Sequence, residues 1–323
     1  MTEINEPTSD TPATVTGIDD GTVREYCLSI ARLIDDTAHY APHEPGGEIK
    51  EIDEAFSSAI FSAPLSYTHQ LIGYYLNGVR DGLFALSQMF SQHAHSHIPA
   101  AVLTRQIVEY SASAYYLCDP HDSREMRIAK MLSMYKKGLL QKHLPAPGVH
   151  ELYVAVNRVL NDWHSGASLP TPSPPFGSIT KAVASLLTDF THEAVAEGSY
   201  RRLSGLAHAS PRDLTSLYEL MWRDSKQMQA VHYAATVGDI AVALRSSFAA
   251  MTRAYSVRSV PSELDQRLLQ IKLQHFGLMI DELTARLGKF WKVDAPRLTT
   301  DAYASRGMQP PDLSDLAAQP SMP

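Results

Sequence analysis

Apolar residues recur every three or four positions through most of this chain, which is the period of a helix with one buried face. The pattern is clear over residues 22–39, where Val23, Cys27, Ile30 and Leu33 fall on one side of a helix. No segment alternates apolar and polar residues over a strand's length, and no repeat of fixed period occurs. The pattern therefore predicts an all-α, multi-helix bundle.

Capping residues and prolines divide this pattern into separate helices. Asp119 followed by Pro120, and Ser210 followed by Pro211, each place a capping side chain before a proline suited to a first helical turn. The predicted helices cover residues 22–39, 48–62, 66–92, 99–118, 120–142, 149–164, 178–197, 199–209, 211–226, 227–255 and 262–291.

Segments without helical periodicity set the domain organisation. Residues 1–20 form a predicted disordered acidic tail, and residues 294–323 form a second disordered tail that is rich in proline. Residues 165–177 hold four prolines and are predicted to be an extended linker or loop. It separates an N-terminal helical part, 21–164, from a C-terminal helical part, 178–293, which is expected to pack on the first.

The charge of the chain is concentrated near its N-terminus. The formal net charge is −7, but residues 1–60 contain 13 Asp/Glu and 3 Lys/Arg, and the remainder contains 22 and 25. The acidic N-terminal region is therefore a candidate contact for a protein partner. The rest is near neutral, which neither demands nor excludes a nucleic acid partner.

The spacing of the cysteines bears on metal binding, and polar residues within the longest uncharged stretches bear on membrane association. Cys27 and Cys118 belong to no CxxC or CxxH pair, so we expect free thiols, no structural zinc and no cofactor. Residues 55–79 and 82–104 lack charged side chains, but prolines, histidines and amides interrupt both. We therefore expect core helices, no membrane association and a cytoplasmic protein.

Three alternating histidines, His93, His95 and His97, form the densest group of metal-ligating side chains. A spacing of two places side chains on opposite faces of a helix, whereas ligands on one helix face lie three or four residues apart. No acidic or cysteine partner lies nearby in sequence. We therefore favour a polar turn between helices over a metal site.

The first candidate site pair is Arg105 and Glu109, which lie four residues apart in an otherwise apolar and aromatic helix, 104–117. That spacing places both on one helix face, where they can form an ion pair. A half-buried pair is costly to keep and often serves function or specificity. An ordinary salt bridge between helices is the alternative.

The second candidate is a polar stripe on the helix 199–209. Tyr200, Ser204 and His208 recur at intervals of four, and Arg201 lies two turns before His208. Phenol, hydroxyl and imidazole groups that face a core need hydrogen-bonding partners. Arg105 and Glu109 are the natural ones, so the two stripes are predicted to form one interior network. The alternatives of catalysis and of a purely structural network both remain open.

Two segments, RQIVEYSASAYYLCDP (105–120) and YRRLSGLAHAS (200–210), carry a family resemblance. They resemble uncharacterised all-helical proteins of actinobacterial type that are distantly similar to the HEPN (higher eukaryotes and prokaryotes nucleotide-binding) superfamily. Many HEPN proteins are metal-independent endoribonucleases of toxin–antitoxin and phage-defence systems. Their signature is an arginine, four to six residues, then a histidine, usually completed by dimerisation. Arg202 and His208 match it with five residues between them, and Arg201 and His208 with six.

The resemblance implies RNA as a substrate, a homodimer, and catalytic roles for His208 and an arginine. His208 would act as general base or acid, and an arginine would stabilise the charge on the phosphorane. No GxSxG, Walker, Rossmann or HExxH motif indicates another reaction. The alternative function is a non-catalytic ligand-sensing or protein-interaction bundle. Basic residues within 121–142 and 201–260 would surround His208 if RNA binds there.

Overall fold

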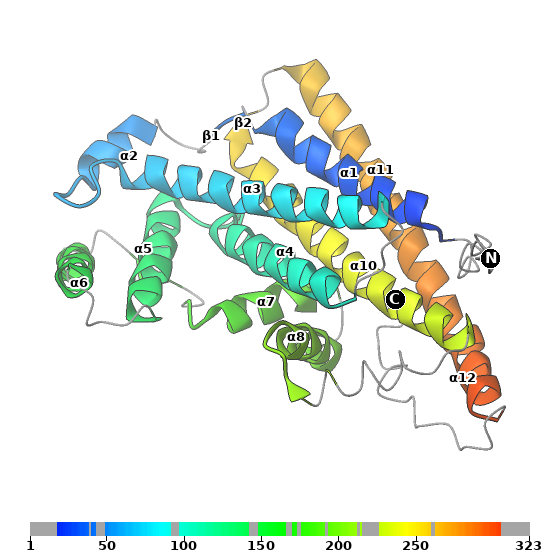
Figure 1. Ribbon diagram of the computed structural model, residues 1–323. Helices are drawn as coiled ribbons and strands as arrows, with labels where there is room; N and C mark the ends of the chain where they lie inside the picture. Colours follow the sequence, from blue (N-terminus) through cyan, green and yellow to red (C-terminus); the bar gives the residue numbers. More distant parts are fainter. Residues whose placement is uncertain are drawn as a thin grey trace, which may run out of the picture.

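The protein is an all-α helical bundle (Figure 1). The computed structural model describes residues 18–38, 40–42, 49–91, 97–141, 148–165, 170–172, 176–190, 193–211, 214, 226–259 and 262–304. Its helices are α1 (Asp20–Thr37), α2 (Ile49–Ala55), α3 (Pro64–Ser91), α4 (His97–Leu117), α5 (Arg124–Gln141), α6 (Val149–Ser165), α7 (Ile179–Thr188), α8 (Glu193–Ala207), α10 (Lys226–Ser256), α11 (Glu263–Lys289) and α12 (Ala295–Ala304), with a π-helical turn, η1 (Phe290–Asp294).

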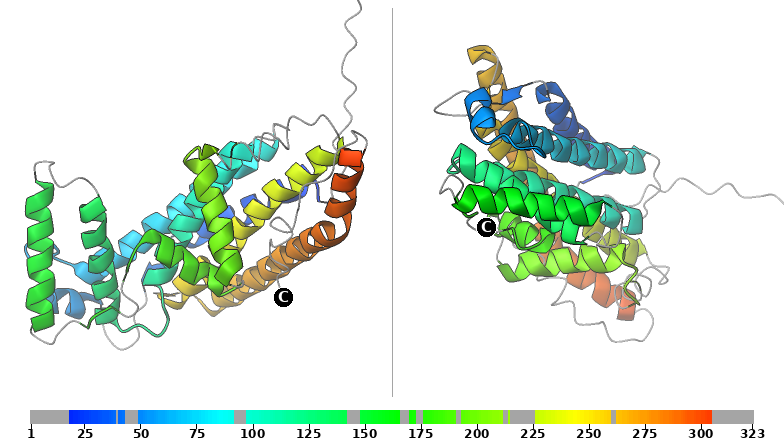
Figure 2. Two further views of the ribbon diagram at one scale, coloured as in Figure 1. Left: turned by 90° about the horizontal axis from the view of Figure 1, so that it is seen from below. Right: turned by 90° about the vertical axis from the view of Figure 1, so that its left-hand side faces the viewer.

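Helix α4 lies at the centre of the bundle and packs against α3, α10, α7 and α8. Helix α1 covers α3, α11 lies along α10, and α5 and α6 form a pair at one end (Figures 1 and 2). Because α4 is covered on so many sides, nearly all of its second half is buried. A polar side chain on α4 therefore needs a partner from a neighbouring helix.

Two glycines on α3 allow α4 to approach closely. A Cβ atom on Gly78 would lie 2.4 Å from the ring of Tyr110, and one on Gly82 would lie 2.6 Å from Cγ1 of Ile107. Both distances are far below van der Waals contact. The α4 side chains therefore occupy the space that a side chain at position 78 or 82 of α3 would need. The spacing of four residues places both glycines on one face of α3.

One hydrophobic core joins helices from both sides of the proline-rich segment 165–177. It contains Ile107 and Leu117 of α4 together with Ile240 and Leu244 of α10. The predicted C-terminal part therefore packs on the N-terminal part. Within the segment itself, residues 166–169 and 173–175 lie outside the described residues.

Two buried basic side chains of α5 satisfy the backbone carbonyls at the C-terminal end of α4. Arg127 donates to the carbonyls of Leu117 and Asp119 at 3.3 Å each, and Lys130 donates to that of Tyr116 at 3.2 Å. The Lys130 ammonium also pairs with Asp122 at 2.6 Å. Positive charge at this end complements the helix dipole and the carbonyls that lack intrahelical partners.

A short bridge that the sequence pattern did not reveal ties the start of the chain to the end of α10. β1 (Ala41–Pro42) pairs antiparallel with β2 (Arg258–Ser259). The half-buried Arg258 also donates to the carbonyl of Thr37 at 3.4 Å and so caps α1. Pairs of two residues are too short to show an alternating pattern.

Most predicted helices are observed within a few residues of their predicted ends, but three boundaries were wrong. The helix predicted over 48–62 ends at Ala55. The Asp119–Pro120 pair starts no helix: Asp119 accepts a hydrogen bond from the N–H of His121 in a turn, and the hydroxyl of Ser123 caps α5 instead. The break predicted at residue 198 lies near Asp189, because α7 ends at Thr188. The helix predicted over 211–226 lies largely outside the described residues.

The predicted C-terminal tail began too early. Residues 295–304 form α12, with Thr299 fully buried and Ala295 nearly so. Pro296 is the second residue of α12 and follows directly on the π-helical turn η1, where the regular α-helical hydrogen bonding is already interrupted. At the other end, Ile18 is buried and Asp19 caps α1, so the predicted tail 1–20 is too long by these residues. Residues 1–17 and 305–323 lie outside the described residues.

Within the described residues, no helix combines the length and the apolar character needed to cross a bilayer. The stretches 55–79 and 82–104 supply parts of α3 and α4, which pack into the core as the sequence predicts.

Candidate functional site at the α4–α8 contact

A small apolar cluster holds helix α8 against α4. Leu203 and Leu206 of α8 pack with Ala101 of α4, and all three side chains are buried. Tyr200, one turn before Leu203, is also buried and belongs to the main core. This contact fixes the polar face of α8 beside the polar face of α4.

Four of the predicted site residues meet across this contact. Arg105 donates from Nε to Oε1 of Glu109 at 2.8 Å, and the hydroxyl of Tyr200 donates to the same oxygen at 2.7 Å. The Nη1 atom of Arg105 lies 2.8 Å from Nε2 of His208. Arg105 therefore links His208 to Glu109, and the predicted connection between the two stripes is confirmed.

The network is only partly interior, contrary to the prediction. The side chains of Arg105 and Glu109 are 19% and 26% exposed, and His208 is exposed. Tyr200 is the buried end and His208 is the solvent end. The cluster therefore reaches from the core to the surface, where a ligand can contact it.

The surroundings shift two of the pKa values. Burial raises the pKa of Tyr200, and its hydrogen bond to the Glu109 carboxylate raises it further. Burial alone would lower the pKa of Arg105, but the charge of Glu109 and the hydrogen bond to it outweigh that effect and raise it. Tyr200 therefore stays a hydrogen-bond donor, and Arg105 stays charged.

The contact with Arg105 engages Nε2 of the His208 ring. A guanidinium has only donors, so Nε2 of His208 must be the acceptor and carries no proton in this arrangement. The ring is then the tautomer with its proton on Nδ1. The one lone pair of Nε2 is engaged by Arg105 in this arrangement, so Nε2 can accept a proton from a bound hydroxyl only after that contact opens.

The backbone directly after His208 is strained. Ala209 has φ of +53°, a left-handed conformation that is unfavourable for a residue with a Cβ atom. It ends α8 in a Schellman arrangement, in which the N–H of Ser210 donates to the carbonyl of Gly205 at 2.8 Å and that of Ala209 to Leu206 at 3.2 Å. His208 thus occupies the last position before a strained turn, a combination often found at functional sites.

Two other predicted residues, Ser204 and Arg201, lie beside the network without joining it. No hydrogen bond of the Ser204 hydroxyl to another described residue is present, although its carbonyl accepts the N–H of His208 at 3.0 Å. Arg201 is exposed on α8, two turns before His208. Among the described residues Arg201 makes no ion pair, so its charge is available to solvent.

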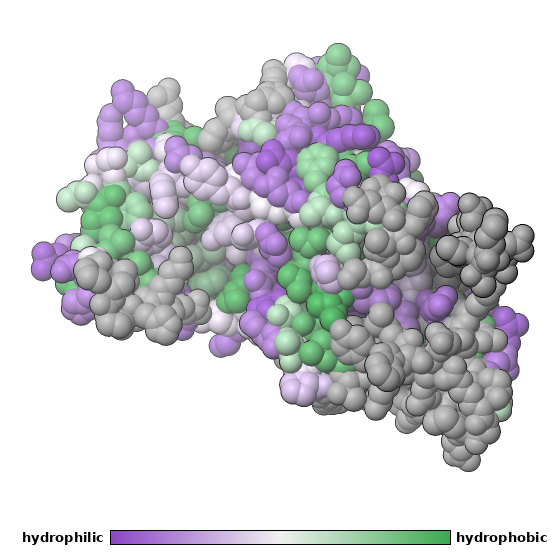
Figure 3. Space-filling model, in the orientation of Figure 1, coloured by the Kyte–Doolittle hydropathy of each residue, from purple (hydrophilic) through white to green (hydrophobic). Residues whose placement is uncertain are grey.

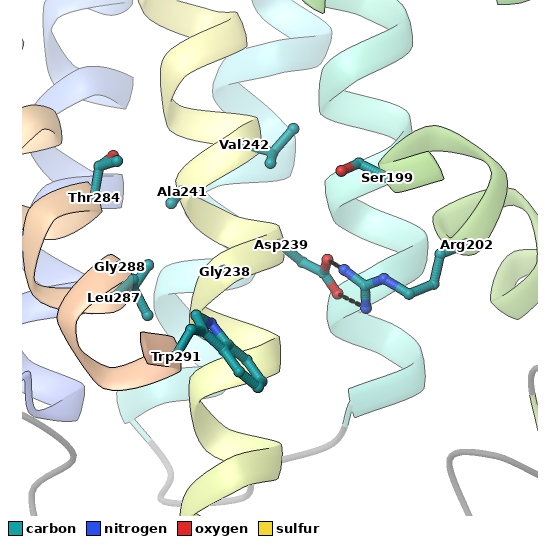
Figure 4. A pocket seen from close by; sticks show the side chains of 10 residues that line it. All are labelled: Ser199, Arg202, Gly238, Asp239, Ala241, Val242, Thr284, Leu287, Gly288 and Trp291. Carbon is teal, nitrogen blue, oxygen red and sulfur yellow. Dashed lines mark hydrogen bonds and ion pairs between the residues drawn. The ribbon is translucent and has the colours of Figure 1, made fainter. Parts of the chain in front are cut away.

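Arg202 points in another direction, toward α10. Its guanidinium pairs with both carboxylate oxygens of Asp239, with Nη1 at 3.0 Å from Oδ2 (Figure 4). Asp239 is buried, so this pair locks α8 to α10. The arginine that matches the HEPN spacing with five intervening residues is therefore engaged away from His208.

A partly open pocket lies beside this ion pair. It is lined by Arg202, Asp239, Thr284 and Trp291 among others (Figure 4). The only ion pair drawn among its lining residues, Arg202–Asp239, is satisfied within the protein. We therefore place the candidate site at the exposed end of the Arg105 network rather than in this pocket.

Of the histidine cluster, only His97 lies within the described residues. Its Nδ1 contacts the hydroxyl of Thr236, and its ring lies 5.1 Å from that of the buried His232 on α10. His93 and His95 lie outside the described residues. The residues that are described contain no group of three side chains arranged to hold a metal ion.

Sequence reasoning missed Asp239 and His232, the two α10 residues that hold α8 and α4. Asp239 is a single acidic residue within the apolar run TVGDIAVAL, residues 236–244. A lone charge in such an apolar run requires an opposite charge nearby, so this pattern could have indicated a partner.

Three basic residues of 121–142 and 201–260 lie at the C-terminal end of α4, away from His208. Arg127 and Lys130 are buried at the far end of α4. Arg253 pairs with Asp119 at 3.7 Å, also at that end. Their charges neutralise carbonyls and carboxylates of the protein itself.

Comparison with known proteins gives no match for this chain among protein-family models, curated proteins or solved structures.

Proposed function

We propose that the protein is a metal-independent endoribonuclease whose reacting groups lie at the exposed end of the α4–α8 contact. The proposal rests mainly on one observation, the 2.8 Å contact between Nη1 of Arg105 and Nε2 of the exposed His208. It joins a proton acceptor to a fixed positive charge at the protein surface. The resemblance of residues 105–120 and 200–210 to HEPN proteins supports the same reaction.

The proposed reaction is attack of an RNA 2′-hydroxyl on the adjacent phosphorus. When RNA binds, Nη1 of Arg105 turns from Nε2 of His208 to the phosphate, and the freed Nε2 takes the hydroxyl proton. The 2′-oxygen then bonds to phosphorus, and the bond to the 5′-oxygen breaks as that oxygen takes a proton from water. The products are a 2′,3′-cyclic phosphate and a 5′-hydroxyl. Arg105 and Arg201 offer positive charge to the phosphorane oxygens, where it lowers the barrier most.

The remaining network residues act as positioning groups in this proposal. Glu109 holds the guanidinium of Arg105 through Nε, and Tyr200 holds the carboxylate of Glu109 in turn. Neither reaches the surface as far as His208 does. They fix the orientation of Arg105 before substrate binds, which reduces the reorganisation needed in the reaction.

The proposal is tested with the purified full chain, single-stranded RNA and a chelator. We expect cleavage that yields 2′,3′-cyclic phosphate ends and that fails on a strand with 2′-deoxyribose throughout. His208→Ala should reduce the rate by about 100-fold or more, and Arg201→Ala should reduce it without loss of helicity. His150→Ala and Arg24→Ala remove matched exposed side chains elsewhere and should leave the rate unchanged.

Either of two results would reject the proposal. One is an absence of cleavage by the wild-type chain across varied RNA sequences. The other is cleavage by the His208→Ala variant at the wild-type rate.

A second candidate function is a non-catalytic protein-interaction bundle, favoured by the placement of the basic side chains. Arg127, Lys130 and Arg253 pair within the protein, so these three charges add nothing to a positive surface around His208. The acidic N-terminal region would then be the contact for a protein partner. Two results together would favour this function. The chain would neither bind nor cleave RNA, and removal of residues 1–17 would abolish its binding to a protein partner.

A further inference from the structure

The outer face of α11 carries an exposed apolar stripe. Leu264, Leu268, Ile271 and Leu278 are between 48% and 70% exposed. They make up four of the eight large hydrophobic side chains that are exposed among the described residues, which concentrates such surface on one helix. Scattered exposed leucines are ordinary, but a contiguous row of them indicates an interaction surface.

The stripe has the spacing of a coiled-coil seam. Its members are separated by four, three and seven residues, and His275 fills the remaining position of the series. This is the heptad pattern through which two helices pack side by side. The opposite face of α11, which includes Leu269, Phe276 and Ile280, is buried against the rest of the bundle.

The stripe lies where another molecule can reach it. Helix α11 runs along the outer edge of the bundle in the view from below (Figure 2). In Figure 3, hydrophobic surface also appears at the protruding tip where α11 begins. The candidate RNA site belongs to other helices, α4 and α8, so occupation of α11 does not require that site.

We propose that α11 binds the α11 helix of a second copy of this chain in an antiparallel arrangement. In that pairing Leu268 packs against Leu278 of the second copy, and Ile271 packs against His275. Two-fold symmetry repeats each contact, so a surface with both halves of the pattern is self-complementary.

The charges beside the stripe favour this arrangement. Antiparallel pairing with Leu268 opposite Leu278 sets Arg267 across from Asp281 of the second copy, twice. Arg267 is exposed and has no ion pair among the described residues, and the Asp281 side chain is 67% exposed although it pairs with Arg245. Opposite charges that flank an apolar seam determine partner and orientation.

One like-charge contact in the antiparallel pairing is already neutralised within each copy. Lys272 would approach Lys272 of the second copy near the two-fold axis. Each Lys272 ammonium, however, lies 3.0 Å from Oδ2 of Asp36 on α1 of its own chain. The positive charge that faces the axis is therefore reduced.

A parallel pairing is less favourable. It would set Arg267 beside Lys272 of the second copy, a like-charge contact within the apolar stripe. Its attractive counterpart, Asp281 beside Arg286, lies beyond the last leucine at Leu278. The seam spans roughly 21 Å from Leu264 to Leu278, at 1.5 Å per residue. So short a seam indicates a reversible dimer rather than a permanent one.

Analytical ultracentrifugation of the full chain tests the proposal. We expect a monomer–dimer equilibrium that depends on concentration. The double variant Leu268→Glu/Leu278→Glu should be monomeric, because it places charges in the seam. Val154→Glu, at an exposed apolar position on α6, is the matched control and should dimerise as the wild type does. A wild-type chain that stays monomeric, or a double variant that still dimerises, overturns the proposal.

A charge exchange tests the orientation and does not depend on loss of folding. Arg267→Glu alone and Asp281→Arg alone should each weaken dimerisation by about tenfold or more, since each creates two like-charge pairs. An equimolar mixture of the two variants should recover it, because both cross-pairs become attractive again. Failure of the mixture to recover dimerisation rules out the antiparallel seam.

Cross-linking gives an independent readout of the same geometry. The native Cys27 and Cys118 are buried, so introduced cysteines react alone. A mixture of Leu264→Cys and Glu282→Cys chains should form a mixed disulfide on oxidation, because these positions face each other in the antiparallel pairing. A disulfide between two Leu264→Cys chains would instead indicate a parallel pair and reject the proposal, since about 27 Å would separate these positions.

Discussion

Replacement of Glu109 by alanine distinguishes the structural part of the α4–α8 network from its reactive end. Glu109 accepts hydrogen bonds from Arg105 and from Tyr200 through a single oxygen. Its removal leaves a half-buried guanidinium and a buried phenol without their acceptor. The side chain of His208, in contrast, contacts Arg105 through Nε2 and lies at the surface.

The magnitudes follow from these contacts. A hydrogen bond to a charged group contributes about 1.5–3 kcal/mol when buried. Because the Glu109 side chain is 26% exposed, water replaces part of the loss, and we expect Glu109→Ala to lower the free energy of unfolding by about 2 kcal/mol. Tyr200→Phe removes one of the two bonds and should cost about 1 kcal/mol. His208→Ala removes an exposed side chain and should cost about 0.5 kcal/mol or less.

Urea unfolding followed by far-ultraviolet circular dichroism measures these differences, provided that the slope of the transition stays constant between variants. The same variants are assayed for RNA cleavage. We expect His208→Ala to lose activity at nearly unchanged stability, and Glu109→Ala to lose stability as well. A His208→Ala variant destabilised as much as Glu109→Ala would refute a surface reactive role and make the histidine a structural member of the network.

Three further substitutions test the local structure. Ala209→Gly should raise the free energy of unfolding by about 1 kcal/mol in urea unfolding, because glycine adopts positive φ without strain. Gly82→Ala should lower the melting temperature by steric overlap with Ile107, at a cost of about 1–3 kcal/mol, whereas Gly138→Ala, where a Cβ meets nothing within 4 Å, should raise it. Asp19→Ala should cost about 1 kcal/mol at pH 7 by loss of the α1 cap. The backbone N–H that this carboxylate accepts lowers the pKa of Asp19, so the stabilisation is present above the unfolded pKa and is lost on acidification through the lower folded value.

The helices could be predicted from sequence because each has enough turns to repeat its apolar pattern. α1 and α10 are observed within about two residues of their predicted ends. Boundaries failed where two start patterns competed. At the start of α5, both Asp119 and Ser123 can cap, and only the packing of Arg127 against the end of α4 selects the second.

The link between Arg105, Glu109, Tyr200 and His208 could also be predicted, because each stripe places polar residues at helical spacing on a largely apolar helix. The depth at which this network lies in the protein could not be predicted. Exposure depends on how α8 is inclined across α4, and that is set by the cluster of Leu203, Leu206 and Ala101 rather than by the polar residues. His208 therefore lies at the surface, although the apolar pattern of its helix predicts a buried helix.

The tandem arginines of α8 show how burial separates residues that a motif treats alike. Arg201 and Arg202 both satisfy an arginine-to-histidine spacing, but neighbouring helix positions face about 100° apart. Arg202 meets the buried carboxylate of Asp239, and its loss would leave an uncompensated charge in the core. Arg201 keeps the same face as His208 and stays exposed. Of the two, only Arg201 can approach a phosphate without breaking the contact between α8 and α10, so the spacing with six intervening residues is the one that can serve chemistry.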